Sequence, residues 1–205
     1  MIARQAHAAG ARVVNDADAT AACLDRVTMA ERAQAAGLPF PRTYGFARVA
    51  DVRAPGRLIL KQRRSRRGEP VPHCGTADEL REAAADWPDE PVVAQEFADG
   101  DGWDRKLWVI GDRVFAGLRR SPLHGPDPQG PKHTIPIPAH EIPPVHRELA
   151  YAVGECFGLD VYGVDLIAAP EGPRIVDVNA FPGFRSIAEA PAALARFTAS
   201  RLNAP

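Results

Sequence analysis

Two apolar segments near the end of the chain, each interrupted by one carboxylate, constrain the fold more than any other feature. The first covers residues 161–168 and contains Asp165, and the second covers residues 173–178 and contains Asp177. A turn at 169–172, with a proline and a glycine, separates them. This pattern predicts two antiparallel strands joined as a hairpin. A carboxylate in such a strand is costly to bury unless it is paired or holds a cation.

The placement of these carboxylates predicts a metal site. On adjacent antiparallel strands Asp165 and Asp177 would lie side by side, where they repel each other unless a cation sits between them. Asn179 comes two residues after Asp177, so strand alternation puts it on the same face. Three hard oxygen ligands suit Mg²⁺, with Mn²⁺ as a second candidate, better than zinc or copper. The competing interpretation is that Asp177 and Asn179 are strand-end or turn residues beside Pro-Gly.

The remaining pattern mixes helices with strands. It predicts helices over 2–9, 25–36, 78–87, 145–157 and 186–202, and further strands over 11–14, 58–61, 91–95, 106–110 and 113–118. Residues 63–72 and 121–144 are expected to be loops or otherwise irregular, because Pro, Gly, Arg or His are frequent there. Since several strands are joined as hairpins, the pattern favours an α+β fold over a doubly wound parallel sheet.

The composition is that of an ordinary globular protein, with 45% hydrophobic and 25% charged residues. The formal net charge of -1 gives no general attraction to nucleic acid or to a membrane surface. No apolar run approaches the ~20 residues that span a bilayer. We therefore expect a cytoplasmic protein with neither nucleic acid nor membrane as its partner. The 3 cysteines are widely spaced and are expected to be reduced thiols without a chemical role.

Two motifs carry a resemblance to a known family. Residues 163–166 read Gly-Val-Asp-Leu, and residues 176–183 read Val-Asp-Val-Asn-Ala-Phe-Pro-Gly. Together they resemble the metal-binding end of ATP-grasp enzymes, in particular the ribosomal-protein glutamate ligases and their relatives. They also resemble the inositol polyphosphate kinases of the same fold. Many of the ligases have Glu where this chain has Asp177, and the Asp form is seen in the kinase branch.

The resemblance runs from about Arg12 to the C-terminus and implies two α+β subdomains that grip ATP between them. Residues 25–98 would form the small subdomain and hinge, and residues 99–205 the C-terminal subdomain with the metal site. Residues 1–24 would be the remnant of an N-terminal substrate domain that relatives carry in full. This minimal form would leave an open substrate face, or a face covered by a second copy or by a partner chain.

The resemblance also implies which residues contact the nucleotide. Lys61, at the end of an apolar strand, would reach the α- and β-phosphates, and Arg26 stands where many relatives have a lysine that contacts ATP. Backbone groups of Glu96, Phe97 and Ala98 would read the adenine edge at the hinge, with the ring of Phe97 packed nearby.

Further residues would act on the ribose, the phosphates and the substrate. Asp104 would accept from the ribose hydroxyls, and Lys106 would face the phosphates. Arg119 or Arg120 would meet the γ-phosphate or an acyl phosphate; adjacent strand residues point to opposite faces, so only one of them can do so. The residues expected to bind an anionic substrate are Arg66, Arg67 and Arg185. The competing interpretation is a solvated basic loop for Arg66 and Arg67 and a surface salt bridge for Arg185.

The implied activity is an ATP- and magnesium-dependent carboxylate–amine ligase that forms an amide or peptide bond through an acyl phosphate. Its substrate would be a small-molecule, peptide or carrier-bound carboxylate. A kinase of the same fold that phosphorylates a hydroxyl is the alternative, because the first chemical step needs the same residues. A nucleotide-binding module without turnover is a third possibility, disfavoured because a cluster of carboxylates is costly to keep.

Overall fold

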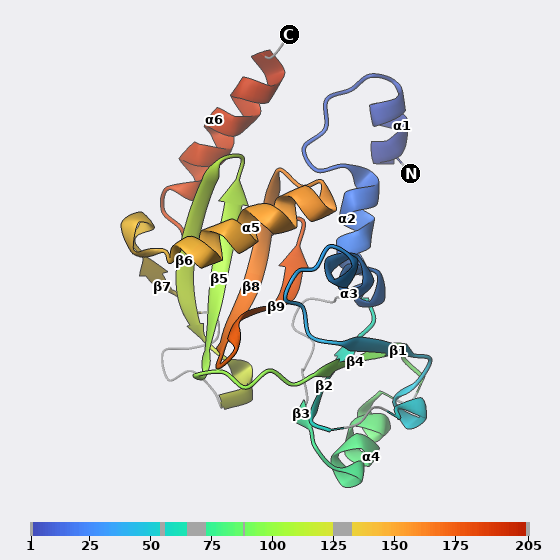
Figure 1. Cartoon of the computed structure of the whole chain (residues 1–205). Coiled ribbons are helices and arrows are strands. Elements are labelled where there is room, and N and C mark those ends of the chain that lie inside the picture. The colour runs from blue at the N-terminus through green and yellow to red at the C-terminus, as the bar shows by residue number, and fades with distance from the viewer. Residues whose placement is uncertain (1, 54–55, 65–72, 88, 125–132, 204–205) are drawn as a thin grey trace.

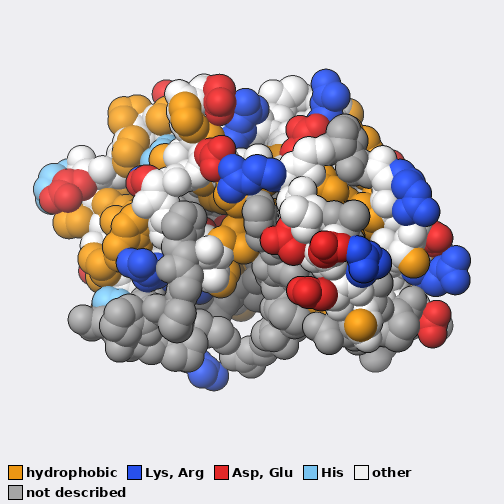
Figure 2. Space-filling model, turned by 90° about the horizontal axis from the view of Figure 1, so that it is seen from below, with side chains coloured by type: hydrophobic (Ala, Val, Ile, Leu, Met, Phe, Trp, Pro, Cys, Tyr) orange, Lys and Arg blue, Asp and Glu red, His pale blue; other side chains and the backbone are white. Residues whose placement is uncertain are grey.

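The computed structural model describes residues 2–53, 56–64, 73–87, 89–124 and 133–203. They form two antiparallel sheets, one of five strands and one of four, with helices packed on each (Figure 1). In these ranges, every helix is too short or too polar to cross a membrane. Seen from below, the described acidic and basic side chains lie interspersed on the surface (Figure 2).

The larger sheet has the strand order β7-β6-β5-β8-β9. Its strands are β5 (Trp103–Ile110), β6 (Arg113–Arg120), β7 (Ile135–Ile137), β8 (Val161–Ala169) and β9 (Gly172–Asn179). Helix α5 (Pro144–Phe157) covers one face, and helix α6 (Ala190–Asn203) packs on part of the other face against Trp108 and Ile110. The rest of that second face is left for the site described below.

The smaller sheet has the strand order β1-β4-β2-β3 and lies below the larger one in Figure 1. Its strands are β1 (Thr43–Phe46), β2 (Leu58–Gln62), β3 (His73–Cys74) and β4 (Val92–Glu96). Leu58, Leu60 and Val92 pack in one core with Trp87, at the end of helix α4 (Ala77–Asp86). The opposite side chains of β2 and β4 therefore face away from α4, toward the larger sheet.

Three helices precede the sheets: α1 (Ile2–Ala8), α2 (Ala17–Leu24) and α3 (Arg26–Ala35). Short 3-10 helices lie at Val49–Asp51, Pro122–His124 and Ala139–Glu141. Cys23 of α2 and Met29 of α3 are buried in the same core as Val178 of β9 and Phe157 of α5. The core of the larger sheet therefore contains residues from both sides of residue 25, where the sequence predicted the start of the small subdomain.

Asn15 fastens the N-terminal segment to the larger sheet. It is 6% exposed and has a left-handed backbone conformation with φ of 59°, which Asn adopts more readily than most residues. Its side-chain amide donates to the carbonyls of Val161 and Ala180, and its carbonyl accepts from the N–H groups of Asp160 (2.9 Å) and Val161 (3.0 Å). The start of β8 and the end of β9 are thus joined through one side chain.

Most expected elements are confirmed, and the α+β class with them. Asp25 caps α3 by accepting from the N–H groups of Val27 and Thr28, and Gly158 ends α5 in a left-handed conformation with φ of 68°. The strand expected at 11–14 is wrong, because this segment is irregular. Val14 packs against the buried residues between α6 and the larger sheet and does not pair with a neighbouring strand. The sequence reading missed α2, β1, β3 and β7. The last helix begins at Ala190 rather than 186, with Pro191 in its first turn, where a missing N–H costs little.

Candidate active site

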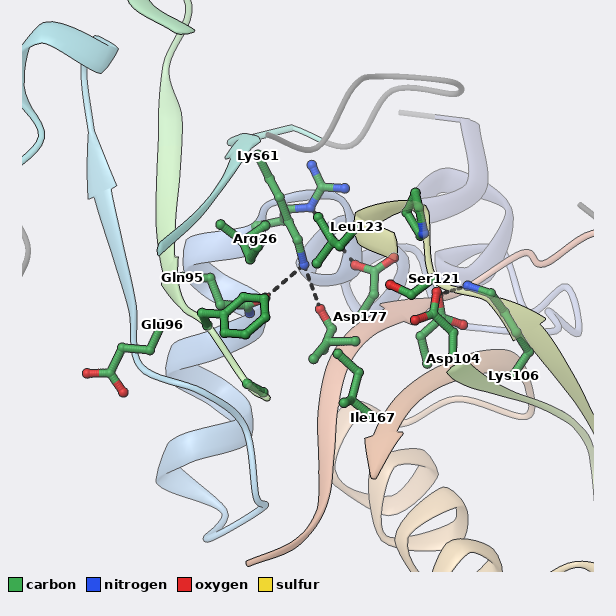
Figure 3. Close-up of a pocket in the computed structure, with 16 residues that line it drawn as sticks. Arg26, Lys61, Gln95, Glu96, Asp104, Lys106, Ser121, Leu123, Ile167 and Asp177 are labelled. Atoms are coloured by element: carbon green, nitrogen blue, oxygen red, sulfur yellow. Dashed lines mark hydrogen bonds and ion pairs between the residues drawn. The ribbon is translucent and has the colours of Figure 1, made fainter. Parts of the chain in front are cut away.

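A cavity of about 190 Å³ lies between the two sheets (Figure 3). Its lining combines apolar side chains with cations and carboxylates, which come from both sheets and from α3. The lining residues are Arg26, Ile59, Lys61, Gln95, Glu96, Phe97, Ala98, Asp104, Lys106, Ser121, Pro122, Leu123, Asp165, Ile167, Val176 and Asp177. Most of the residues expected to bind nucleotide or metal are therefore brought to one place.

Lys61 reaches from the smaller sheet across the cavity. It is 9% exposed, and its Nζ donates to Gln95 Oε1 (2.8 Å) and to the backbone carbonyl of Val176 in the larger sheet (3.0 Å). Both acceptors are neutral, so they hold the ammonium in place without cancelling its charge. This arrangement suits a lysine that delivers positive charge to an anion in the cavity.

Arg26 supplies a second cation from the first residue of α3. Its guanidinium Nη1 donates to the carbonyl of Gln62 (2.7 Å), and its Nε lies 4.0 Å from a carboxylate oxygen of Asp177. The side chain is buried, with 8% exposure of the residue. A buried arginine keeps its charge at any physiological pH, so Arg26 adds fixed positive charge beside Asp177.

Asp165 and Asp177 are direct partners across β8 and β9, as the sequence predicts. Burial raises the pKa of Asp177, and the neighbouring Asp165 raises it further, whereas Arg26, Lys61 and Lys106 lower it. Two buried carboxylates side by side are unfavourable on their own, and the cations around them offset this repulsion.

A β-bulge at Val176 gives the second carboxylate its direction. Asp165 pairs with Asp177, but the next pair along β8 and β9 is Leu166 with Ile175, so Val176 is an extra residue. Strict alternation would put Ile175 and Asp177 on the same face. Because of the bulge, Ile175 is buried in the core on the α5 side while Asp177 lines the cavity. The displaced Val176 carbonyl is the acceptor that Lys61 uses.

Lys106 lies opposite Asp165 on β5 and forms an ion pair with it. Burial lowers the pKa of Lys106, but Asp165 and Asp104 outweigh this effect, and the pKa is raised overall. Burial also raises the pKa of Asp104, while Lys106 and a hydrogen bond with the Ser121 side chain lower it. Lys106 faces the cavity, whereas Arg105 on the opposite face pairs with Asp101.

Asn179 has a local role in the structure. Its side-chain oxygen accepts from the N–H of Phe181 (2.9 Å), which forms a tight turn after β9. The residue is exposed and does not belong to the cavity lining given above. The turn was the competing interpretation of this residue, and a metal ligand at Asn179 would have to leave that hydrogen bond or share its oxygen.

The donor set fits a hard divalent cation. Two carboxylates meet in register on the cavity side, and both now depend on lysine and arginine for compensation. Oxygen donors of this kind suit Mg²⁺, which keeps several positions for water and phosphate. In the part of the chain that the structure describes, no group of three or more His, Cys, Asp and Glu side chains could by itself hold a metal. A cation here would therefore need further ligands, such as phosphate oxygens.

The hinge residues Glu96, Phe97 and Ala98 also line the cavity, and the side chain of Glu96 points away from the charged cluster (Figure 3). The N–H groups of Glu96 and Phe97 donate to the backbone carbonyls of Arg42 (2.8 Å) and Arg57 (3.0 Å). Recognition of adenine at this segment would therefore use carbonyl groups or the Ala98 N–H. Phe97 packs under the Arg57 guanidinium, 4.1 Å from the ring centre.

Of the two adjacent arginines on β6, Arg119 shares a face with the cavity. It is the direct partner of Asp104 across β5 and β6, and its guanidinium donates to the Thr134 hydroxyl (2.9 Å). Arg120 points to the other face and is exposed. Arg119 is therefore on the sheet face that carries the cavity, although neither arginine belongs to the cavity lining given above, and its role in phosphate binding stays a prediction.

Of the three arginines expected to bind substrate, Arg185 alone falls within the described residues. Arg185 is exposed in the segment after β9 and does not line the cavity, and Arg66 and Arg67 fall outside the described residues. The sequence reading missed Gln95 and Ser121, both buried polar residues of the lining. A polar residue inside the apolar strand at 91–95 was the available signal for Gln95, since a buried amide needs partners.

Comparisons with known proteins agree with this geometry. Residues 46–192 match the RimK-like ATP-grasp domain family. A probable alpha-L-glutamate ligase 2 of Shewanella amazonensis is 32% identical over 108 residues, which cover 48% of this chain and 33% of that protein. The chain thus spans about a third of the length of the curated relatives it matches.

Two solved structures show the same fold. A RimK domain ATP-grasp protein from Sphaerobacter thermophilus superposes with a TM-score of 0.74 at 20% identity, over 98% of this chain and 75% of that one. The ATP-grasp ligase PsnB, complexed with precursor peptide PsnA2 and AMPPNP, superposes with a TM-score of 0.68 at 22% identity, over 98% and 65%. With the family match over most of its length, the chain belongs to the RimK-like ATP-grasp domain family.

Proposed function

We propose that this protein is an ATP- and magnesium-dependent carboxylate–amine ligase that works in the cytoplasm. The observation that carries the proposal is the convergence of Lys61 and Arg26 with Lys106, Asp165 and Asp177 on one cavity between two sheets. Three cations beside a carboxylate pair suit a polyphosphate with its metal. The ligase names of the relatives favour amide formation as the reaction.

In this proposal each part of the nucleotide is bound by different residues of the cavity. Lys61 and Arg26 bind phosphate oxygens, Asp104 accepts from the ribose hydroxyls, and the segment 96–98 contacts adenine. Arg119 lies on the face of Lys106 and would neutralise charge on the transferred phosphoryl group. Mg²⁺, held by Asp165 and Asp177, would add charge neutralisation and orient the phosphates.

The reaction would proceed in two steps. A carboxylate oxygen attacks the γ-phosphorus, the bond to the ADP oxygen breaks, and an acyl phosphate forms. An amine nitrogen then attacks the acyl carbon, phosphate leaves, the amine gives up a proton, and an amide remains. Positioning and fixed positive charge supply most of the catalysis.

The substrate class is a small-molecule, peptide or carrier-bound carboxylate. PsnB, which shares the fold, was solved with a precursor peptide, and this supports a peptide as one candidate. A homodimer, or a partner chain beside residues 1–24, stays a further prediction. Gel filtration at working concentration tests the homodimer, which a clean monomer would exclude.

Nucleotide binding is tested first by the melting temperature with and without Mg²⁺ and ATP. A ligand at ~100 times its Kd stabilises the fold by about 2.7 kcal/mol, which should raise the Tm by about 5–10 °C. Asp177→Asn should lose the magnesium-dependent part of this shift. Asp112→Asn, in the exposed turn between β5 and β6, removes the same charge away from the cavity and should keep it. No shift in the wild type with ATP, ADP or GTP would overturn the proposal.

The reaction is tested by phosphorus NMR of the products formed from ATP with candidate amino acids and peptides. Free phosphate together with a new amide establishes the ligase. A stable phosphoester would instead establish the kinase alternative, which Asp177 in place of the ligases' Glu keeps open.

A further inference from the structure

Gln95 is a buried amide on the cavity side of the central strand of the smaller sheet. It is 4% exposed, and its chain neighbour Ala94 is fully buried in the core on the other side. Burying an amide in such surroundings is unfavourable unless both of its ends are hydrogen-bonded. An apolar residue would fill this position at lower cost, so the contacts of the amide indicate what Gln95 contributes.

Both ends of the amide have defined partners. Its Oε1 accepts from Lys61 Nζ (2.8 Å), and its Nε2 donates to the Thr43 hydroxyl (3.3 Å). That hydroxyl in turn donates to the backbone carbonyl of Pro41 (3.0 Å). Because the Thr43 hydroxyl proton is donated to the Pro41 carbonyl, the hydroxyl oxygen can only accept from the Gln95 side chain. The N–H end of the amide therefore faces Thr43, and its oxygen faces Lys61.

The hydrogen bonds from Thr43 through Gln95 to Lys61 are called the relay below, and the sheet register sets the spacing of these three residues. Thr43 of β1 and Ile59 of β2 are both direct partners of Gln95 on β4, so these three residues form one row across the sheet. Lys61 follows Ile59 by two residues and lies on the same face. Hydrogen-bonded strands therefore hold the relay, and no loop has to order before it can form.

We propose that Gln95, oriented by Thr43, is a positioning residue that aims the Lys61 ammonium at the phosphates of a bound nucleotide. A neutral acceptor suits this task, because it fixes the ammonium without neutralising it. A carboxylate at the same place would compete with the phosphates for the lysine. The proposal rests on the proposed function, since it needs a nucleotide in this cavity.

A double-mutant cycle tests the relay. The Kd for ADP is measured by calorimetry, without metal, for the wild type, Gln95→Leu, Lys61→Met and the double variant. If Gln95 acts through Lys61, Gln95→Leu weakens ADP binding about tenfold in the wild type and changes it less than about twofold in the Lys61→Met background. Adenosine, which has no phosphates, should bind Gln95→Leu as it binds the wild type.

A second substitution keeps the test decisive if Gln95→Leu does not fold. Thr43→Val keeps the shape of the side chain and removes only the hydroxyl, so it should weaken ADP binding about threefold, again only when Lys61 is present. Gln95→Glu should weaken ADP binding at pH 8, because its carboxylate pairs with the lysine.

The outcomes separate the relay from the function on which it rests. Equal losses in the two backgrounds, or an equal loss of adenosine binding, would mean that Gln95 is only structural, and would overturn the relay alone. A folded wild type that binds neither ADP nor ATP would overturn the proposed function and the relay with it.

Discussion

The two lysines that face the cavity have different hydrogen-bond partners. Lys61, on the smaller sheet, is held by an amide oxygen and a backbone carbonyl, both neutral. Lys106, on the larger sheet, is paired with the Asp165 carboxylate, and Asp104 also raises its pKa. Lys106 is therefore in direct contact with a carboxylate, whereas the hydrogen bonds described above for Lys61 go to neutral oxygens and its charge lowers the pKa of Asp177 from farther away.

This difference indicates how the two sheets divide the task. In the proposed function, the smaller sheet would contribute Lys61 to the binding of phosphates. The larger sheet holds a carboxylate pair whose charge Lys106 helps to balance, a role that a metal ion would take over in the proposed function. A cation between Asp165 and Asp177 has to compete with the ammonium of Lys106, and a phosphate chain can attract that ammonium away.

The largest effect is expected for nucleotide binding. Lys61→Met should weaken ADP binding without metal by about a hundredfold, because it removes the ammonium that neutral oxygens hold toward the cavity. Lys106→Met should weaken it by about tenfold at most, because Asp165 already offsets that charge. Calorimetric titration measures both, and Arg120→Met, on the opposite face, serves as the control. Equal losses of ADP affinity for the two lysine variants would contradict this difference between Lys61 and Lys106.

Stability should show the reverse order. Asp165→Asn removes the carboxylate partner of Lys106 and should lower the free energy of unfolding by about 2 kcal/mol, less than for a fully buried pair because both side chains keep some exposure. The expected fall in Tm is about 4–8 °C. Gln95→Leu, which removes a neutral partner of Lys61, should cost about 1 kcal/mol. Thermal unfolding without ligands measures both, and a larger loss for Gln95→Leu would count against the comparison.

A smaller effect is expected for metal binding without nucleotide. Lys106→Met should tighten Mn²⁺ binding by about tenfold, since Asp165 then lacks its competing ammonium. Lys61→Met should change it less, because the ammonium in direct contact with Asp165 is that of Lys106. Paramagnetic resonance of free Mn²⁺ measures the affinity. Unchanged binding in Lys106→Met would show that the lysine does not restrain the carboxylates.

The smallest effect concerns Cys23, which is buried in the core of the larger sheet. Burial, helped by the charge of Asp177, raises the pKa of its thiol to about 12. At pH 7–9, well below that pKa, the thiol stays protonated and should hardly react with iodoacetamide. Cys156, which is less buried, should react first in the folded protein. Mass spectrometry of the alkylated peptides checks the order, and rapid labelling of Cys23 would mean that the core behind Asp177 opens.

Sequence patterns predicted the hairpin that pairs Asp165 with Asp177 well, because each strand carries its own signal. The apolar run, the turn and the single carboxylate are all local, so Asp165 and Asp177 could be paired without coordinates. Lys61 was predictable for the same reason, as a charge at the end of an apolar strand. The family resemblance supplied the cavity that joins them.

Features that depend on distant contacts were out of reach. The relay from Thr43 to Gln95 joins strands that are far apart in the sequence, and the fixed turn at Asn15 depends on carbonyls from β8 and β9. The strand expected at 11–14 failed because an apolar run says that residues are buried, but not whether they pair with a neighbouring strand. Arg119 and Arg120 could be separated only by the register of β5 and β6.

The bulge at Val176 has a consequence for how this stretch of the gene can change. A gain or loss of one codon usually shifts a strand by one position and turns its buried side chains outward. Here one surplus residue already separates the core position Ile175 from the cavity position Asp177. Deletion of Val176 would make Ile175 and Asp177 consecutive residues, and regular alternation alone would then put them on opposite faces of the strand. What the deletion would remove is the displaced carbonyl that accepts from Lys61, so a one-residue loss at this point should leave the core and the carboxylate pair in place and change how Lys61 is held.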